Sequence, residues 1–93
     1  MVRKRRKLTT LRSVGKAVEK DFALLSINWV DELVGRDGLS LYNELCQKTG
    51  VRHDPCVLDV FRCAIAQAEN PELPVEQKDW WYWSAMRKGE QND

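Results

Sequence analysis

Apolar side chains recur every three to four residues along much of this chain, which is the spacing of helices that bury one face. Together with residue types that start and stop helices, this spacing predicts five helices, at residues 8–12, 16–25, from Asp37 or Ser40 to Gly50, from Asp54 to about Ala68, and from about Glu76 onward. Asn28 is expected to cap a further short helical segment that carries Trp29, Val30, Leu33 and Val34. No segment favours a strand, so we predict a compact all-α domain.

The helix that begins at Asp54 is expected to form the buried centre of this domain. Asp54 is a favourable N-cap, and Pro55 suits the first turn because its missing N–H is not needed there. Apolar side chains cover most of the circumference of this helix, namely Val57, Leu58, Val60, Phe61, Cys63, Ala64, Ile65 and Ala68. A helix with so little polar surface is typical of a position between other helices.

The segment Leu11-Arg12-Ser13-Val14-Gly15-Lys16-Ala17 leads directly into the predicted helix 16–25 and looks like a helix-hairpin-helix. Gly15 leaves no side chain over the first free amides of that helix, and these amides attract anions. Lys16 adds a full positive charge, and Arg12 can reach the same phosphate. Such hairpins usually carry a glycine where Ser13 stands, so this hairpin is expected to be less open or to offer a hydroxyl. The alternative is a ligand-free turn between two helices.

A longer resemblance covers Leu11 to Ala66 and is strongest at residues 11–17 and 49–64, the latter reading Thr49-Gly50-Val51-Arg52-His53-Asp54-Pro55-Cys56-Val57-Leu58-Asp59-Val60-Phe61-Arg62-Cys63-Ala64. There the chain resembles the pathogenicity-locus family of small bacterial helix-hairpin-helix proteins, some of which are labelled mitomycin resistance proteins. The resemblance implies a compact helical fold of the helix-hairpin-helix (SAM-like) type. It also implies a role in DNA binding.

Charge is distributed unevenly along the chain, although the net charge is only +1. Residues 1–20 carry one acidic and eight basic side chains, which are Arg3, Lys4, Arg5, Arg6, Lys7, Arg12, Lys16 and Lys20. The remaining residues carry seven basic and 13 acidic ones. We expect a disordered basic arm at 1–7, one helical domain at 8–88 and a polar tail at 89–93, with the arm on the nucleic-acid backbone beside the hairpin. A merely solvated arm is the alternative.

Length and composition exclude several classes of protein. A chain of 93 residues forms one core, too small for the deep pocket of a typical enzyme, so we expect no catalytic activity and no cofactor. The sequence has no apolar run of membrane-spanning length and no secretory signal. Three cysteines without a framework spacing suit reduced thiols, so we expect a cytoplasmic location.

A second glycine turn, at Gly50, precedes the predicted helix at Asp54 and presents Arg52 and His53 as possible phosphate ligands. A structural turn whose polar groups cap helix ends is the favoured interpretation. Cys56 lies in the first turn of the next helix, where free amides can lower the pKa of a thiol. A reactive thiol is therefore an alternative, against a small buried side chain.

Four residues, Cys46, His53, Cys56 and Cys63, are of the types that bind zinc. Structural zinc sites usually contain closely spaced pairs of ligands, and here only His53 and Cys56 are close in sequence. We therefore predict no metal site.

The aromatic run Trp80-Trp81-Tyr82-Trp83 spreads around a helix at about 100° per residue, so at least one ring should be partly exposed. Packing of Trp80 and Trp83 inward is the favoured arrangement. An exposed ring can stack on an unpaired base or contact a partner protein.

These patterns favour a protein that binds DNA backbone phosphates, duplex or single-stranded, without reading sequence, because no long basic recognition helix is present. A helical module for protein–protein interaction is the alternative, as is a thiol protein that acts through Cys56 in drug resistance.

Overall fold

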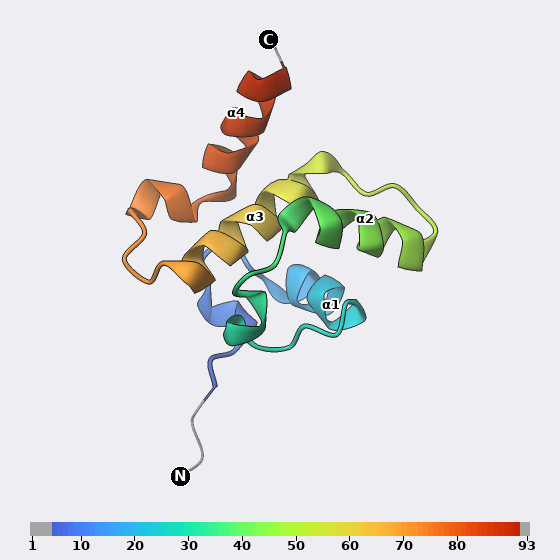
Figure 1. Ribbon diagram of the computed structural model, residues 1–93, viewed down its shortest axis with the longest axis horizontal. Helices are drawn as coiled ribbons and strands as arrows, with labels where there is room; N and C mark the ends of the chain where they lie inside the picture. Colours follow the sequence, from blue (N-terminus) through green and yellow to red (C-terminus); the bar gives the residue numbers. More distant parts are fainter. Residues whose placement is uncertain (1–4, 92–93) are drawn as a thin grey trace.

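The computed structural model describes residues 5–91 of the chain, and the side chains of residues 5–89. Four α-helices follow one another, α1 (Lys16–Leu24), α2 (Gly38–Thr49), α3 (Pro55–Glu69) and α4 (Trp80–Gln91) (Figure 1). Three short 3-10 helices lie between or before them, η1 (Leu8–Thr10), η2 (Val30–Leu33) and η3 (Val75–Lys78). Within residues 5–91 the only β-type pairing is an isolated bridge between Lys7 and Trp29. The all-helical fold class is thus confirmed, with four α-helices where the sequence analysis expected five.

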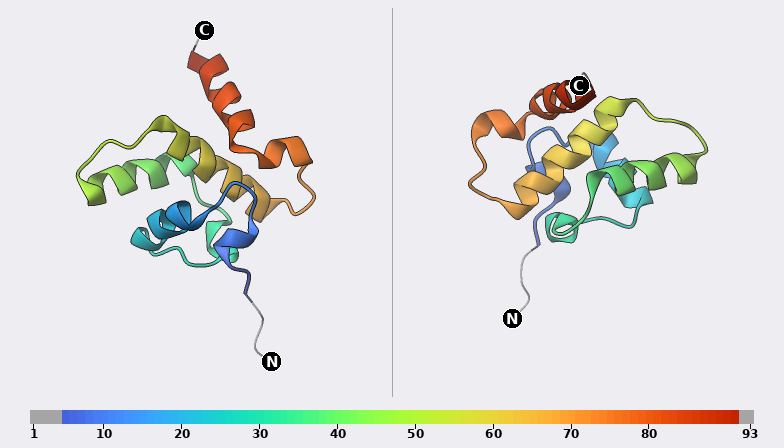
Figure 2. Two further views of the ribbon diagram at one scale, coloured as in Figure 1. Left: turned by 180° about the vertical axis from the view of Figure 1, so that it is seen from behind. Right: turned by 45° about the horizontal axis from the view of Figure 1, so that its top comes forward.

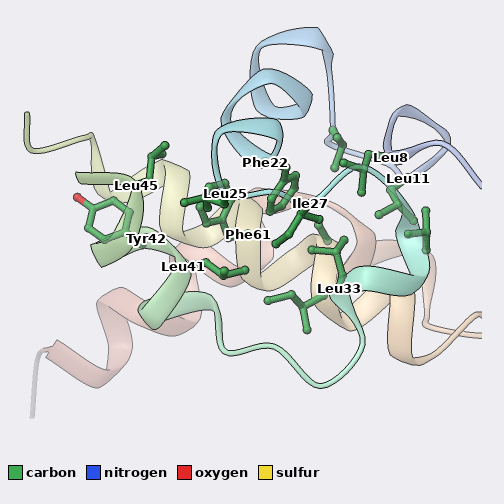
Figure 3. Packing of buried hydrophobic residues seen from close by; sticks show 14 of the residues in the cluster. Leu8, Leu11, Phe22, Leu25, Ile27, Leu33, Leu41, Tyr42, Leu45 and Phe61 are labelled. Atoms are coloured by element: carbon green, nitrogen blue, oxygen red, sulfur yellow. The ribbon is translucent and has the colours of Figure 1, made fainter. Parts of the chain in front are cut away.

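Helix α3 forms the centre of the domain, as predicted. It packs against both α2 and α4 and also contacts η2 and η3 (Figure 1). Its Phe61 ring is fully buried and stacks on Phe22 of α1, with the ring centroids 4.6 Å apart. Figure 3 shows this pair in the middle of a core to which α1, α2, α3, η1 and η2 contribute. The labelled core residues are Leu8, Leu11, Phe22, Leu25, Ile27, Leu33, Leu41, Tyr42, Leu45 and Phe61.

Two of the predicted helix starts are confirmed in detail. The Asp37 carboxylate accepts a hydrogen bond from the Ser40 amide at 3.0 Å, and the Asp54 carboxylate accepts one from the Cys56 amide at 2.8 Å. Each carboxylate thereby satisfies one of the free amides at a helix start and has its pKa lowered by that bond. The N-termini of α2 and α3 are therefore closed by their own caps.

The short segment near residue 30 starts differently from the prediction. Trp29, rather than Asn28, occupies the N-cap position of η2. The carboxylate of Glu32 accepts hydrogen bonds from both the Asn28 and the Trp29 amides, at 2.9 and 3.0 Å. The Glu32 carboxylate, and not the Asn28 side chain that the sequence predicted, therefore caps this segment.

The C-terminal part of the chain also differs from the prediction. A single helix was expected from about Glu76, whereas η3 ends at Lys78 and α4 begins at Trp80. Asp79 lies between them with an extended backbone (φ −99°, ψ 131°). Helix α4 continues to Gln91, so residues 89–91 of the expected polar tail are helical. It projects from the rest of the domain, at the opposite end from residue 5 (Figures 1 and 2).

The attachment of α4 to the domain depends on a buried ion pair. The Arg87 guanidinium donates two hydrogen bonds to the Asp59 carboxylate of α3, at 2.9 and 3.1 Å. Asp59 is fully buried, and the side chain of Arg87 is 12% exposed. The carboxylate raises the pKa of Arg87, mainly through these hydrogen bonds, and so keeps the guanidinium charged.

Candidate phosphate-binding hairpin

In the turn before α1, Ser13 has a left-handed backbone conformation at the position where a glycine is usual. Its φ is +73°, a value that residues other than glycine rarely adopt. Its hydroxyl donates a hydrogen bond to the Lys78 carbonyl at 3.0 Å and accepts one from the Trp80 amide at 3.1 Å. These two contacts offset the backbone cost of a serine here. The Ser13 hydroxyl therefore joins the hairpin to the start of α4.

A glutamine of the central helix fixes the same turn from the other side. Gln67 of α3 accepts a hydrogen bond from the Arg12 amide at 2.9 Å and donates one to the Arg12 carbonyl at 2.8 Å. Its side chain is buried, and the flanking Leu11 and Val14 are buried in the core. Sequence reasoning missed Gln67, although a glutamine within an apolar helix is a signal that a polar partner lies opposite. The hairpin is consequently held by backbone-directed contacts on both sides.

The N-terminus of α1 is open to solvent. Gly15 is the N-cap, no side chain among the described residues caps this helix start, and a Cβ atom at Gly15 would meet open space. The first backbone hydrogen bond into the helix runs from the Glu19 amide to the Gly15 carbonyl at 3.0 Å, so the preceding amides of the first turn remain free. Gly15, Lys16 and Ala17 are all exposed. Helix α1 therefore differs from α2 and α3, each of which has one first-turn amide occupied by a capping carboxylate.

The charged groups near this helix start are mostly basic. Lys16 and Lys20 are exposed and lie one turn apart on α1, with half-buried Glu19 as the acidic residue of the first turn. Arg12 forms an ion pair with Asp79 at 2.7 Å, but its side chain remains 53% exposed. The hairpin thus combines free amides with two exposed ammonium groups and one guanidinium that is partly neutralised.

The predicted basic arm is only partly described, and its described part is engaged elsewhere. Arg5 forms two hydrogen bonds with Asp31, at 3.1 and 3.2 Å, and its guanidinium lies 5.2 Å from the centroid of the Trp29 ring. The Arg6 carbonyl accepts a hydrogen bond from the Val30 amide at 3.1 Å. The side chains of Arg6 and Lys7 are exposed, whereas Arg3 and Lys4 lie outside the described residues. The structure therefore joins residues 5–7 to η2, and not to the hairpin.

The second glycine turn is built from polar contacts within the protein. Gly50 ends α2 in the left-handed conformation (φ +72°). The Thr49 hydroxyl lies 2.8 Å from Nε2 of His53, and the Tyr42 hydroxyl donates a hydrogen bond to the His53 carbonyl. His53 is thus a partner for the end of α2, while Arg52 is exposed. This arrangement agrees with the structural interpretation of the turn.

Cys56 does not have the activated thiol that its position at a helix start suggested. The neighbouring Asp54 carboxylate and partial burial raise the pKa of the Cys56 thiol, with Asp59 adding to the effect. The reactive-thiol alternative is therefore not supported, because the Asp54 carboxylate accepts the Cys56 amide hydrogen bond and raises the thiol pKa by its own hydrogen bond and charge.

The raised pKa gives an expected result for thiol modification. At pH 7.5, iodoacetamide should alkylate Cys56 more slowly than it alkylates glutathione, because the thiolate fraction is smaller. Asp54→Asn removes the nearby negative charge and should accelerate the reaction. Mass spectrometry of each cysteine-containing peptide over time measures both rates. Faster labelling of native Cys56 than of glutathione would contradict this explanation.

The described cysteines do not form a metal site with other side chains. Within the described part of the chain, no group of three or more His, Cys, Asp or Glu side chains is arranged to hold a metal ion. Cys63 is fully buried, and burial raises the pKa of its thiol. Cys46 accepts a weak hydrogen bond from the His53 amide at 3.5 Å. These cysteines thus serve the packing of the domain.

The aromatic run at the start of α4 has one ring in solvent. Trp81 is 57% exposed, whereas Trp80, Tyr82 and Trp83 are partly buried. The indole N–H of Trp83 donates a hydrogen bond to the Gln77 carbonyl at 2.8 Å. Trp80 and Trp83 are thus partly buried, as Tyr82 is, and Trp81 is the exposed ring that the spread around the helix requires.

The fold and the hairpin define an all-helical domain with an uncapped, lysine-flanked helix start, and comparison with known proteins places this domain in a family. The model of the family described as pathogenicity locus matches residues 2–89, so the chain belongs to the pathogenicity-locus family. The chain is 38% identical over 81 residues to the mitomycin resistance protein McrB of Streptomyces lavendulae. The match covers 87% of this chain and 73% of that relative. No solved structure matches the chain significantly.

None of the described helices combines the length and the apolar character needed to cross a bilayer.

Proposed function

We propose that this protein is a non-enzymatic, cytoplasmic DNA-binding protein that grips backbone phosphates at the N-terminus of α1. The observation that carries the proposal is the uncapped start of this helix, with Gly15 open to solvent and Lys16 directly after it. Free amides at a helix start carry partial positive charge and accept phosphate oxygens. The relative's name suggests that such binding serves resistance to mitomycin.

The support around the hairpin favours a preformed phosphate site. Gln67 holds the Arg12 backbone, and the Ser13 hydroxyl holds the turn against the start of α4. A site fixed in this way loses little conformational entropy when a phosphate binds. Lys16 and Lys20 can each add a contact to the phosphate or to its neighbour along the strand.

The same geometry supports binding without sequence preference. Amides and lysines at a helix start contact the sugar–phosphate backbone, which carries no base-specific pattern. One such site should bind DNA with a Kd on the order of 1–100 μM at physiological salt, as non-specific complexes do. The free amides, rather than a basic recognition helix, are thus the proposed source of affinity.

Lys16→Glu tests this proposal. The substitution places a negative charge beside the free amides and should weaken DNA binding about tenfold or more, since charge-assisted hydrogen bonds contribute about 1.5–3 kcal/mol. It should also reduce the slope of log K against log salt by about one phosphate contact. Fluorescence anisotropy of labelled DNA at several salt concentrations measures both quantities.

Lys48→Glu is the matched control for this experiment. Lys48 is exposed in the last turn of α2 and its replacement changes the net charge by the same amount. If binding depends on the hairpin, Lys48→Glu should have a much smaller effect than Lys16→Glu. Equal losses for the two variants would show that only overall charge matters, and the proposal would then be wrong.

A further inference from the structure

The start of α4 lies directly against the proposed phosphate site. The Trp80 amide donates to the Ser13 hydroxyl at 3.1 Å, and Asp79 pairs with Arg12 at 2.7 Å. These contacts join two segments that are 67 residues apart in sequence. In both views of Figure 2 the turn before α1 passes beside the junction of η3 and α4. The aromatic run therefore begins next to the hairpin.

Trp81 is the ring of this run that is most available to a ligand. It is 57% exposed, and its ring contacts that of Trp80, at 6.0 Å between centroids and an interplanar angle of 79°. An edge-to-face contact of this kind restrains a ring without stacking on it. The backbone at Trp81 is also fixed, because the preceding residue is held by Ser13. A restrained and exposed indole is the type of platform on which nucleobases stack.

We infer that the DNA bound at the hairpin is single-stranded, with a phosphate on the amides of the α1 start and an unpaired base stacked on Trp81. This inference rests on the proposed function and specifies its ligand. A base can reach an indole only when it is not paired and stacked within a duplex. Duplex DNA can use the phosphate site alone.

The distances involved suit a short strand. The hydrogen bond between the Trp80 amide and the Ser13 hydroxyl holds these two residues together. Three Cα steps of about 3.8 Å separate them from Trp81 and Gly15, so the Trp81 and Gly15 backbones lie about 18 Å apart or less. A stacked strand rises about 3.4 Å per nucleotide, so roughly five or six nucleotides span both contacts. Two lysines lie in this region as well, since exposed Lys16 begins α1 and the carbonyl of half-buried Lys78 is bound by Ser13. A twelve-nucleotide strand is therefore a sufficient probe.

The test compares three labelled probes, dT12, a twelve-base-pair duplex and an abasic strand of the same length, by anisotropy with the full chain. Trp81→Ala should weaken dT12 binding about 5- to 150-fold, the range found when one stacking ring is removed. Trp81→Phe should retain most of the affinity. The abasic strand should bind the native protein about as weakly as dT12 binds Trp81→Ala. Duplex binding should be unchanged by Trp81→Ala.

Met86→Ala is the control, because Met86 is a second exposed apolar side chain of α4, at 51% exposure. It should leave dT12 binding unchanged. Equal dT12 affinity for native protein and Trp81→Ala, with Lys16→Glu still weakening both DNA forms, would overturn the inference while the proposed function stands. Failure of every probe to bind at low salt would overturn both.

Discussion

Gly15→Asp should abolish DNA binding while stabilising the fold. Gly15 has an extended backbone (φ −94°, ψ −172°) that any residue can adopt, and a Cβ atom there meets open space. An aspartate at this N-cap would place its carboxylate on the free amides of α1, as Asp37 and Asp54 do at the next two helices. A cap of this kind is worth about a few tenths of a kcal/mol relative to glycine. The same carboxylate would occupy and repel the site of the phosphate.

Thermal unfolding and DNA anisotropy measure the two effects on the same sample. Gly15→Asn is the matched variant, because its amide oxygen can cap the helix without adding charge. We expect binding to decrease from native protein to Gly15→Asn to Gly15→Asp, with an unfolding temperature at or above the native value in both variants. A Gly15→Asp protein that is folded and binds DNA like the native chain would show that phosphates bind elsewhere.

Arg87→Met should destabilise the domain by about 3–5 kcal/mol, the cost of leaving one member of a buried ion pair without its partner. Asp59 is fully buried, and both of its carboxylate oxygens accept hydrogen bonds from Arg87. Such a loss is a large fraction of the 5–15 kcal/mol by which native domains are usually stable. Urea unfolding followed by circular dichroism measures it.

Arg5→Met removes a pair of similar geometry from the surface and serves as the control. Arg5 and Asp31 are joined by two hydrogen bonds, but their side chains are 42% and 64% exposed. Water screens this pair, so its loss should cost less than about 1 kcal/mol. The Asp59→Leu, Arg87→Met double variant should recover part of the stability, because it leaves no buried charge unpaired. If Arg87→Met and Arg5→Met lowered the free energy of unfolding by similar amounts, burial would not explain the stability that the Arg87–Asp59 pair provides.

The parts of this fold that depend on neighbours in sequence could be predicted from the sequence. Asp37 and Asp54 cap the helices that they precede because an N-cap reaches only two or three residues forward. Gly50 ends α2 because few other residues adopt its positive φ. The apolar circumference of α3 likewise indicated its central position, since such a helix must be covered on most sides.

The contacts that shape the candidate site join residues far apart in the chain, and these could not be predicted. Gln67 and Asp59 stand out as polar residues in the apolar α3, but nothing in the sequence indicates that their partners are Arg12 and Arg87. The pairing of Arg5 with Asp31 was equally unpredictable, because any of the many acidic residues could have supplied the carboxylate. Polar pairing of this kind follows from the packed fold and not from local pattern.

The raised pKa of Cys56 could have been anticipated. Asp54 was predicted as the N-cap of α3, and a capping carboxylate necessarily stands beside the residue two positions later. Its hydrogen bond with the thiol and its negative charge both raise the pKa of Cys56. The charge of a cap should therefore be considered together with the dipole of the helix that it caps.

The central claim is that phosphates bind the free amides at the start of α1, and a ¹H–¹⁵N NMR titration with unlabelled dT12 tests it most directly. We predict that the largest amide shift changes occur at Gly15, Lys16 and Ala17. The starts of α2 and α3, where the negatively charged Asp37 and Asp54 each cap one amide, should change little. Changes confined to Arg5, Arg6 and Lys7, with the α1 start unaffected, would contradict the claim.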